Sequence, residues 1–91
     1  MEYDWDNNKA AINLEDKEVR FEAVFGFDWD EVLEIEDTRK DYGETRMIAY
    51  GPIQGRLHCL VYTMRGSVCR VISLRKTNKK EVEVYEQAKD D

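Results

Sequence analysis

The chain has 91 residues, enough for one domain over residues 1–91, and its 42% apolar and 37% charged residues are typical of a soluble globular protein. No apolar run reaches membrane-spanning length and the N-terminus lacks a signal-like segment, so we expect a cytoplasmic protein without membrane contact. Two cysteines and one histidine argue against a disulfide framework and against a metal site, and we expect no cofactor.

Charge is segregated along the chain, although the formal net charge is −6. Residues 1–44 hold fifteen acids and five bases, whereas residues 45–80 hold eight Lys and Arg and no acid. The tail from Glu81 is acidic again, with five acids and Lys89. Such a distribution predicts a positive face on the folded protein, which points to an anionic partner.

The first half of the chain predicts short, mostly helical elements. We expect an edge strand at residues 2–5 and a helix over residues 9–16, capped by Asp6 or Asn7. Apolar residues at helical spacing predict a second short helix that starts at Phe21 and ends near Gly26. From Glu31 the period changes to two, which predicts a strand around residues 33–36 before a polar loop over residues 37–43.

The second half predicts a strand meander followed by a helix. Three strand-like runs cover residues 46–51, 57–64 and 68–75, with turns at residues 52–55 and at Arg65-Gly66. Asn78 followed by Glu81 has the spacing of a capping box and opens a last helix. The expected fold is a small α+β domain with an antiparallel sheet of four to five strands, two N-terminal helices and one C-terminal helix.

A turn at Arg65-Gly66 fixes which side chains share a face of the sheet. Pairing Met64 with Ser67 gathers polar side chains on one face, which is the candidate site: Arg56, His58, Tyr62, Ser73 and Arg75. The other face is mostly apolar and is the candidate core: Leu57, Cys59, Val61, Thr63, Val68, Ile72 and Leu74.

Three residues need separate treatment in this register. Cys59 and Cys69 lie on opposite faces, so both are expected to be free thiols. Arg70 falls among core positions and must reach a rim, pair with an acid such as Glu22, or be moved by a bulge. Arg46 lies on the apolar side if Gln54-Gly55 is a two-residue turn, and beside Tyr62 if the turn has three residues.

The chain resembles the BrnT family of bacterial toxins over nearly its whole length. The most specific part is the motif from Arg70 to Arg75 (Arg-Val-Ile-Ser-Leu-Arg), followed by Glu81 and Tyr85. Supporting matches are spread along the chain: Trp5-Asp6, Lys9, Asn13-Leu14, Val19, Phe21-Glu22-Ala23, Gly43-Glu44, Arg46, Gly51 and Arg65. One departure is visible: the family commonly reads Lys-His-Gly where this chain reads Asp16-Lys17-Glu18.

The resemblance implies a compact fold like that of the RelE ribonucleases and the role of toxin in a type II toxin–antitoxin pair. It implies RNA cleavage without a metal, inhibition of translation, and neutralisation by the DNA-binding antitoxin BrnA. Promoter DNA is then bound only through the antitoxin. Two alternatives stay open: a catalytically weakened homologue that acts as an antitoxin-binding or co-repressor subunit, and a plain single-stranded nucleic-acid binder.

Metal-independent RNA cleavage needs a base for the 2′-hydroxyl, cations for the phosphorane-like oxygens and an acid for the leaving 5′-oxygen. Arginine forks suit the second task, and we predict Arg75 with Arg46 or Arg70. His58 is the candidate base or acid, and Lys17 stands at the position of the family histidine. The expected substrate-binding residues are Arg56, Tyr62, Lys76, Lys79 and Lys80.

Overall fold

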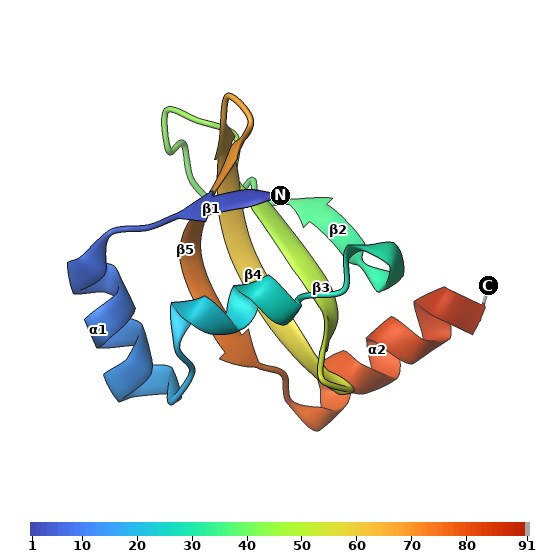
Figure 1. Cartoon of the computed structure of the whole chain (residues 1–91). Helices are drawn as coiled ribbons and strands as arrows, with labels where there is room; N and C mark the ends of the chain where they lie inside the picture. The colour runs from blue at the N-terminus through green and yellow to red at the C-terminus, as the bar shows by residue number, and fades with distance from the viewer. Residues whose placement is uncertain (91) are drawn as a thin grey trace.

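A five-stranded sheet forms the centre of the protein in a computed structural model that describes residues 1–90 (Figure 1). The elements follow in the order β1 (Glu2–Asp4), α1 (Asn7–Lys17), the 3-10 helices η1 (Phe21–Gly26) and η2 (Trp29–Glu31), β2 (Leu33–Glu36), β3 (Met47–Ile53), β4 (Arg56–Arg65), β5 (Val68–Lys76) and α2 (Lys79–Asp90). The strand order is β1-β5-β4-β3-β2. No helix among residues 1–90 is long and apolar enough to cross a membrane.

The predicted α+β class is confirmed, but the expectation of a wholly antiparallel sheet is wrong for β1. Strands β2 to β5 form consecutive antiparallel pairs, whereas β1 pairs with β5 in parallel. Hairpins reverse the chain between β3, β4 and β5, but β1 is joined to the sheet only through α1 and the 3-10 helices. No tight turn therefore fixes its direction relative to β5.

Helix α1 begins and ends at residues with clear local signals. The Asp6 carboxylate accepts hydrogen bonds from the N–H groups of Asn8 (2.8 Å) and Lys9 (3.1 Å), which caps the first turn as predicted. The helix ends at Glu18, whose φ of 61° lies in the left-handed region and whose N–H bonds to the Leu14 carbonyl. Glycine usually occupies such a position, because a Cβ there is strained.

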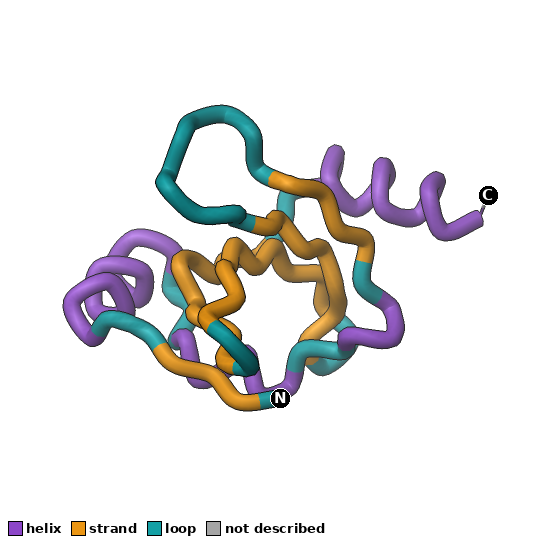
Figure 2. Tube along the Cα trace, turned by 90° about the horizontal axis from the view of Figure 1, so that it is seen from above, coloured by secondary structure: helices purple, strands orange, loops and turns teal. Residues whose placement is uncertain are grey.

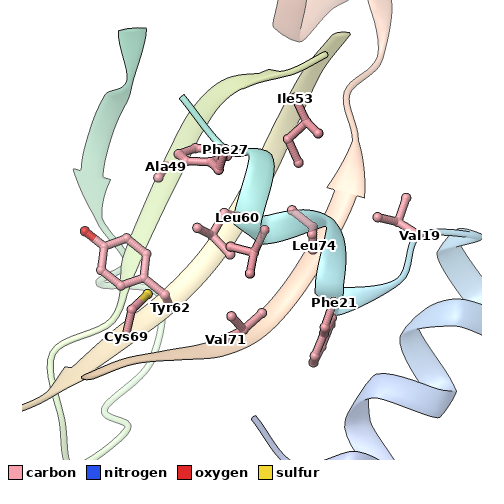
Figure 3. Close-up of a cluster of buried hydrophobic side chains, with 11 residues drawn as sticks. Val19, Phe21, Phe27, Ala49, Ile53, Leu60, Tyr62, Cys69, Val71 and Leu74 are labelled. Atoms are coloured by element: carbon pink, nitrogen blue, oxygen red, sulfur yellow. The ribbon is translucent and has the colours of Figure 1, made fainter. Parts of the chain in front are cut away.

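The hydrophobic core lies between η1 and one face of the sheet, which we call the inner face (Figure 3). Phe21 and Val24 of η1 are fully buried against side chains of three strands: Ala49, Ile53, Leu60, Tyr62, Cys69, Val71 and Leu74. A Cβ on Gly51 would lie 2.7 Å from the Phe27 ring, so this glycine lets the ring lie on β3. In Figure 2 the strands curve around this core, and the loop between β2 and β3 arches away from it.

The predicted β4–β5 register is wrong, and with it the assignment of the two faces. The turn lies at Gly66-Ser67, because Arg65 pairs with Val68. This two-residue shift alone preserves the faces, but a β-bulge follows: Tyr62 pairs with Val71 and Val61 with Ser73, so Ile72 is an extra residue. Beyond the bulge every β5 side chain changes sides, which separates Ser73 and Arg75 from His58 and Tyr62.

The face predicted to be the core lies on the side of the sheet away from η1, and we call it the outer face. It carries Ile48, Tyr50, Cys59, Val61, Thr63, Arg70, Ser73 and Arg75. Alternation did not separate the two faces because β4 is buried on both: Leu57 and Thr63 of the outer face are buried, as Leu60 of the inner face is. Cys59 and Cys69 do lie on opposite faces and are both free thiols, as expected.

Helix α2 projects from the end of β5 and makes few contacts with the sheet (Figure 1). The predicted capping box is present: the Glu81 N–H donates to the Asn78 side chain (2.8 Å), and the Glu81 carboxylate accepts from the Asn78 N–H (2.9 Å). Farther along, Lys89 pairs with Glu31 at 3.3 Å and the Tyr85 hydroxyl donates to the Glu31 carbonyl. No residue of α2 is buried, so these polar contacts hold it.

Candidate active site

A concavity of ≈ 280 Å³ lies on the outer face, and we call it the outer concavity. Helix α1, the loop after β2 and the three long strands all contribute to its lining: Asn13, Lys17, Arg39, Ile48, Tyr50, Cys59, Val61, Ser73 and Arg75. Three of these side chains are cations that come from three separate segments of the chain. A hollow lined in this way attracts an anion the size of a phosphodiester.

The Arg75 guanidinium is oriented by the first turn of α2. Its Nη1 and Nη2 donate to the two oxygens of Glu81, each at 2.8 Å, and Nη1 also donates to the Lys76 carbonyl at 3.3 Å. Among residues 1–90 no partner takes the Nε–H or the second Nη2 hydrogen of Arg75. These two donors form the side edge of the fork, a geometry that matches two oxygens of one phosphate.

Each member of this ion pair shifts the pKa of the other. The hydrogen bonds from Arg75 hold the pKa of Glu81 at about 2, and those to Glu81 raise the pKa of Arg75. Glu81 is therefore ionised at neutral pH, and its charge orients Arg75 while offsetting part of the positive field.

Asn13 anchors α1 to the free edge of β5 and so places Lys17. Its side-chain amide donates to the Leu74 carbonyl (2.7 Å) and the Val19 carbonyl (2.9 Å), and its oxygen accepts from the Leu74 N–H (3.3 Å). The buried amide thus supplies the hydrogen bonds that a neighbouring strand would make where β1 has already ended. Lys17 lies one helical turn after Asn13, on the same side of α1, and lines the outer concavity next to Ser73.

The loop between β2 and β3 carries a cation that sequence reasoning missed. Arg39 donates twice to the Asp37 carboxylate at 2.8 Å, and Tyr42 donates to the same group at 3.0 Å. These bonds lower the pKa of Asp37, whose side chain is almost fully buried. The signal was the i, i+2 spacing of Asp37 and Arg39 in a polar loop, which looked like ordinary solvated charge.

Arg46 and Arg70 also lie on the outer face but outside the lining of the outer concavity. The turn at Gln54-Gly55 has two residues, so Arg46 is on the side predicted for that case. Its guanidinium lies 4.0 Å from the centre of the Tyr42 ring and 3.6 Å from the Glu44 carboxylate. Arg70 reaches the rim and pairs with Asp4 of the adjacent β1 at 3.4 Å, in place of the Glu22 partner considered above.

The remaining predicted site residues are not brought to this face. His58 and Tyr62 lie on the inner face, where both are buried, and Tyr62 donates a hydrogen bond to Glu34. Arg56 and Lys76 lie at the end of the sheet near His58. Lys79 and Lys80 are exposed in the first turn of α2. The prediction that His58, Tyr62 and Arg75 share one face is therefore wrong, and the cause is the bulge at Ile72.

The neutral groups of the outer concavity stay neutral. Burial raises the pKa of the Cys59 thiol and of the Tyr50 hydroxyl. A thiol so protonated is a poor nucleophile, which agrees with reading Cys59 as a packing residue. Within residues 1–90, no three His, Cys, Asp or Glu side chains gather in a group suited to a metal ion.

Comparison with known protein families gives a match over residues 5–81. The matching family is described as BrnT, the ribonuclease toxin of type II toxin–antitoxin systems. The chain belongs to the BrnT family. No curated protein matches the chain.

Membership in the BrnT family connects the geometry with a chemistry. The family is one of ribonuclease toxins, and a type II system supplies an antitoxin partner for the toxin. The matched region contains all the residues that line the outer concavity, together with Glu81. The cationic hollow on the outer face is therefore the candidate active site of this BrnT chain.

Proposed function

We propose that the chain is a metal-independent endoribonuclease that cleaves RNA in the outer concavity, inhibits translation and is neutralised by a BrnA-like antitoxin. The main support for this proposal is that Lys17, Arg39 and Arg75, from three segments of the chain, all line one concavity. Three positive side chains attract a phosphodiester and repel a divalent cation, which supports chemistry by side chains alone. The proposal includes a fold relationship to the RelE ribonucleases.

In the proposed reaction the scissile phosphate takes the free side edge of Arg75. The Nε–H and Nη2–H groups then meet two phosphate oxygens while Glu81 keeps the other edge. The 2′-hydroxyl loses its proton to solvent water as its oxygen bonds to the phosphorus, and the charge that develops on the phosphate oxygens is stabilised by Arg75 and Arg39. Lys17 donates a proton to the 5′-oxygen as its bond to phosphorus breaks, and Arg46 and Arg70 hold neighbouring phosphates on the same face.

The proposal reassigns the role predicted for His58. This side chain lies across the sheet from Arg75, and its Nδ1 is bonded to the Arg56 carbonyl at 2.7 Å. Proton transfer in the outer concavity therefore falls to Lys17. Tyr62 is likewise assigned to the core, where its ring packs edge-on against Trp29.

A catalytically weakened homologue is the second candidate, and a specific observation favours it. Arg39, Arg46, Arg70 and Arg75 each pair with an acid: Asp37, Glu44, Asp4 and Glu81 respectively. These pairs reduce the positive field that RNA meets on the outer face. Such a protein would keep its antitoxin-binding surface and act as a co-repressor subunit on promoter DNA.

Expression of the chain alone in bacteria separates the two candidates. The enzyme predicts growth arrest that Arg75→Ala relieves and that Arg65→Ala, a change in an exposed arginine near the β4–β5 turn, does not. The purified chain should cleave single-stranded RNA equally well with and without EDTA. Normal growth at high soluble expression, with no cleavage in vitro, would favour the co-repressor.

A further inference from the structure

A second concavity of ≈ 470 Å³ opens at the end of the inner face, and we call it the second concavity. It is lined by the C-terminal end of α1, the start of η1 and the ends of three strands: Leu14, Glu18, Val19, Arg20, Ala23, Ile53, Gln54, Arg56, His58 and Lys76. Three permanent cations and the histidine meet there, against one acid. The lining of the second concavity therefore carries a net positive charge, and it shares no residue with the lining of the outer concavity.

The cations of the second concavity are not neutralised by ion pairs. Within residues 1–90, Arg20, Arg56 and Lys76 have no carboxylate within 4.0 Å, whereas the arginines of the outer face are paired. Arg56 is held in place by a hydrogen bond from Nη2 to the Thr77 carbonyl at 2.7 Å. Its remaining guanidinium donors are available to a ligand.

Among the residues that line the second concavity, His58 is the buried polar one. One nitrogen of its ring has no hydrogen-bond partner in the part of the chain that the structure describes. The residue is 6% exposed, and its Nδ1 lies 2.7 Å from the Arg56 carbonyl. A carbonyl only accepts, so Nδ1 carries a hydrogen and Nε2 is left for the concavity. No hydrogen-bond partner for Nε2 occurs in residues 1–90. Once the ring takes a second proton, Nε2 is a donor beside three unpaired cations, an arrangement that suits an oxyanion.

We propose that the second concavity binds a phosphate group of the RNA strand, held by Arg20, Arg56, Lys76 and Nε2 of His58. This inference rests on the proposed function for its ligand. Lys76 follows Arg75 directly in β5, and Glu18 follows Lys17 directly at the end of α1, so the two concavities lie on either side of the same corner of the sheet. An RNA strand that bends around this corner contacts both.

Binding of phosphate is coupled to the protonation of His58. Burial lowers the pKa of His58, and the charges of Arg56 and Lys76 lower it further. The other charged groups of the lining are Arg20 and Glu18, of opposite sign. A bound phosphate adds negative charge next to the ring, which favours the imidazolium and raises the pKa of His58.

The experiment uses the single histidine of the chain as a reporter. The His58 ring resonances of the full chain are followed by NMR during titration with inorganic phosphate at low salt, and the pKa of His58 is measured with and without it. We expect a saturable shift and a raised pKa. Arg56→Gln and Lys76→Gln should each weaken binding by about fivefold, whereas Arg65→Gln, which removes one distant charge, should leave it unchanged.

A short single-stranded RNA then replaces phosphate, with Arg75→Ala protein so that the strand stays intact. The His58 resonance should shift again, and Arg56→Gln should reduce the shift. The inference is overturned if neither probe moves the resonance, or if Arg65→Gln weakens binding as much as Arg56→Gln does. If phosphate binds and RNA does not, the second concavity is not an RNA site and the inference is also overturned. That outcome would assign the concavity to a free phosphate or to acidic groups of the antitoxin. Absence of RNA cleavage by the unmodified chain would count against the proposed function alone.

Discussion

Glu81 and Arg75 form a bidentate ion pair, with both N–O distances at 2.8 Å, that joins the first turn of α2 to the last residues of β5. Glu81 also closes the capping box with Asn78. One carboxylate thus starts the helix and orients an arginine of the candidate active site. The position of α2 and the direction of the Arg75 fork are therefore coupled.

Arg75→Lys should lower RNA cleavage by about 100-fold, because a lysine keeps the charge but lacks the fork that meets two phosphate oxygens. The measurement is the rate of cleavage of a labelled single-stranded RNA. Arg65→Lys is the matched control and should cleave at the original rate. Equal rates for the original chain and Arg75→Lys would place the reacting phosphate elsewhere.

Glu81→Gln should reduce stability in a manner that depends on pH. The pKa of Glu81 is lowered to about 2, so its contribution is complete above the unfolded-state pKa near 4.5 and is lost as the pH falls through about 2. Urea unfolding should show the variant less stable at pH 6 and the two proteins converging between pH 4.5 and 2. A difference that persists unchanged to the lowest pH would contradict this origin.

Lys17→His should raise the cleavage rate near pH 6.5 by about tenfold, because imidazole exchanges protons near neutrality and lines the same concavity. The pH–rate profile should become bell-shaped. Lys9→His, on α1 but outside the outer concavity, is the control for an added histidine. If both variants behave alike, Lys17 takes no part in proton transfer.

Glu18→Gly should stabilise the protein by about 1 kcal/mol, because Glu18 adopts φ 61° at the end of α1 and a glycine is not strained there. Thermal and urea unfolding measure the change. Glu15→Gly, inside the same helix, should destabilise by a similar amount. Destabilisation by both changes would mean that the Glu18 side chain makes a contribution that outweighs its backbone strain.

Asn13→Ala should destabilise the protein by about 3 kcal/mol, because it leaves the buried N–H and carbonyl of Leu74 and the carbonyl of Val19 without partners. Asn8→Ala, at an exposed position of the same helix, is the control. Since α1 carries Lys17, the Asn13 variant should also lose more cleavage activity than its loss of folded protein explains. Near-equal stability of the two variants would show that water replaces the amide.

Sequence reasoning found the elements that depend on local signals. Residue types at short spacing predicted the Asp6 cap, the capping box of Asn78 and Glu81, and the edge strand before α1. They also included the two-residue turn at Gln54-Gly55 as one of two options. These features are decided within a few residues, so the sequence carries them completely. The family motif from Arg70 to Arg75 lies on β5, the strand that carries Arg75 of the candidate site.

The faces of the sheet could not be predicted, because the deciding feature has no local signal. Val71 and Ile72 are both apolar and β-branched, so neither marks itself as the extra residue of a bulge. The covering element itself was predicted, since the spacing of Phe21 and Val24 indicated the short helix that forms η1, but the sequence did not indicate which face of the sheet it covers. The contribution of Arg39 depends on how a ten-residue loop folds back over the sheet, which is a tertiary effect.

The bulge at Ile72 also explains the spacing of the two arginines in the family motif. Arg70 and Arg75 are five positions apart, an odd separation that in a regular strand sends two side chains in opposite directions. Here they emerge on the same side, opposite Thr63 and Cys59 respectively. A regular strand of the same length, without the bulge, would keep every arginine in the sequence yet aim Arg75 into the interior beneath η1. What the motif encodes is therefore a bulge as much as a set of residue types, and a relative with a regular β5 of the same length would lose its site without losing either arginine.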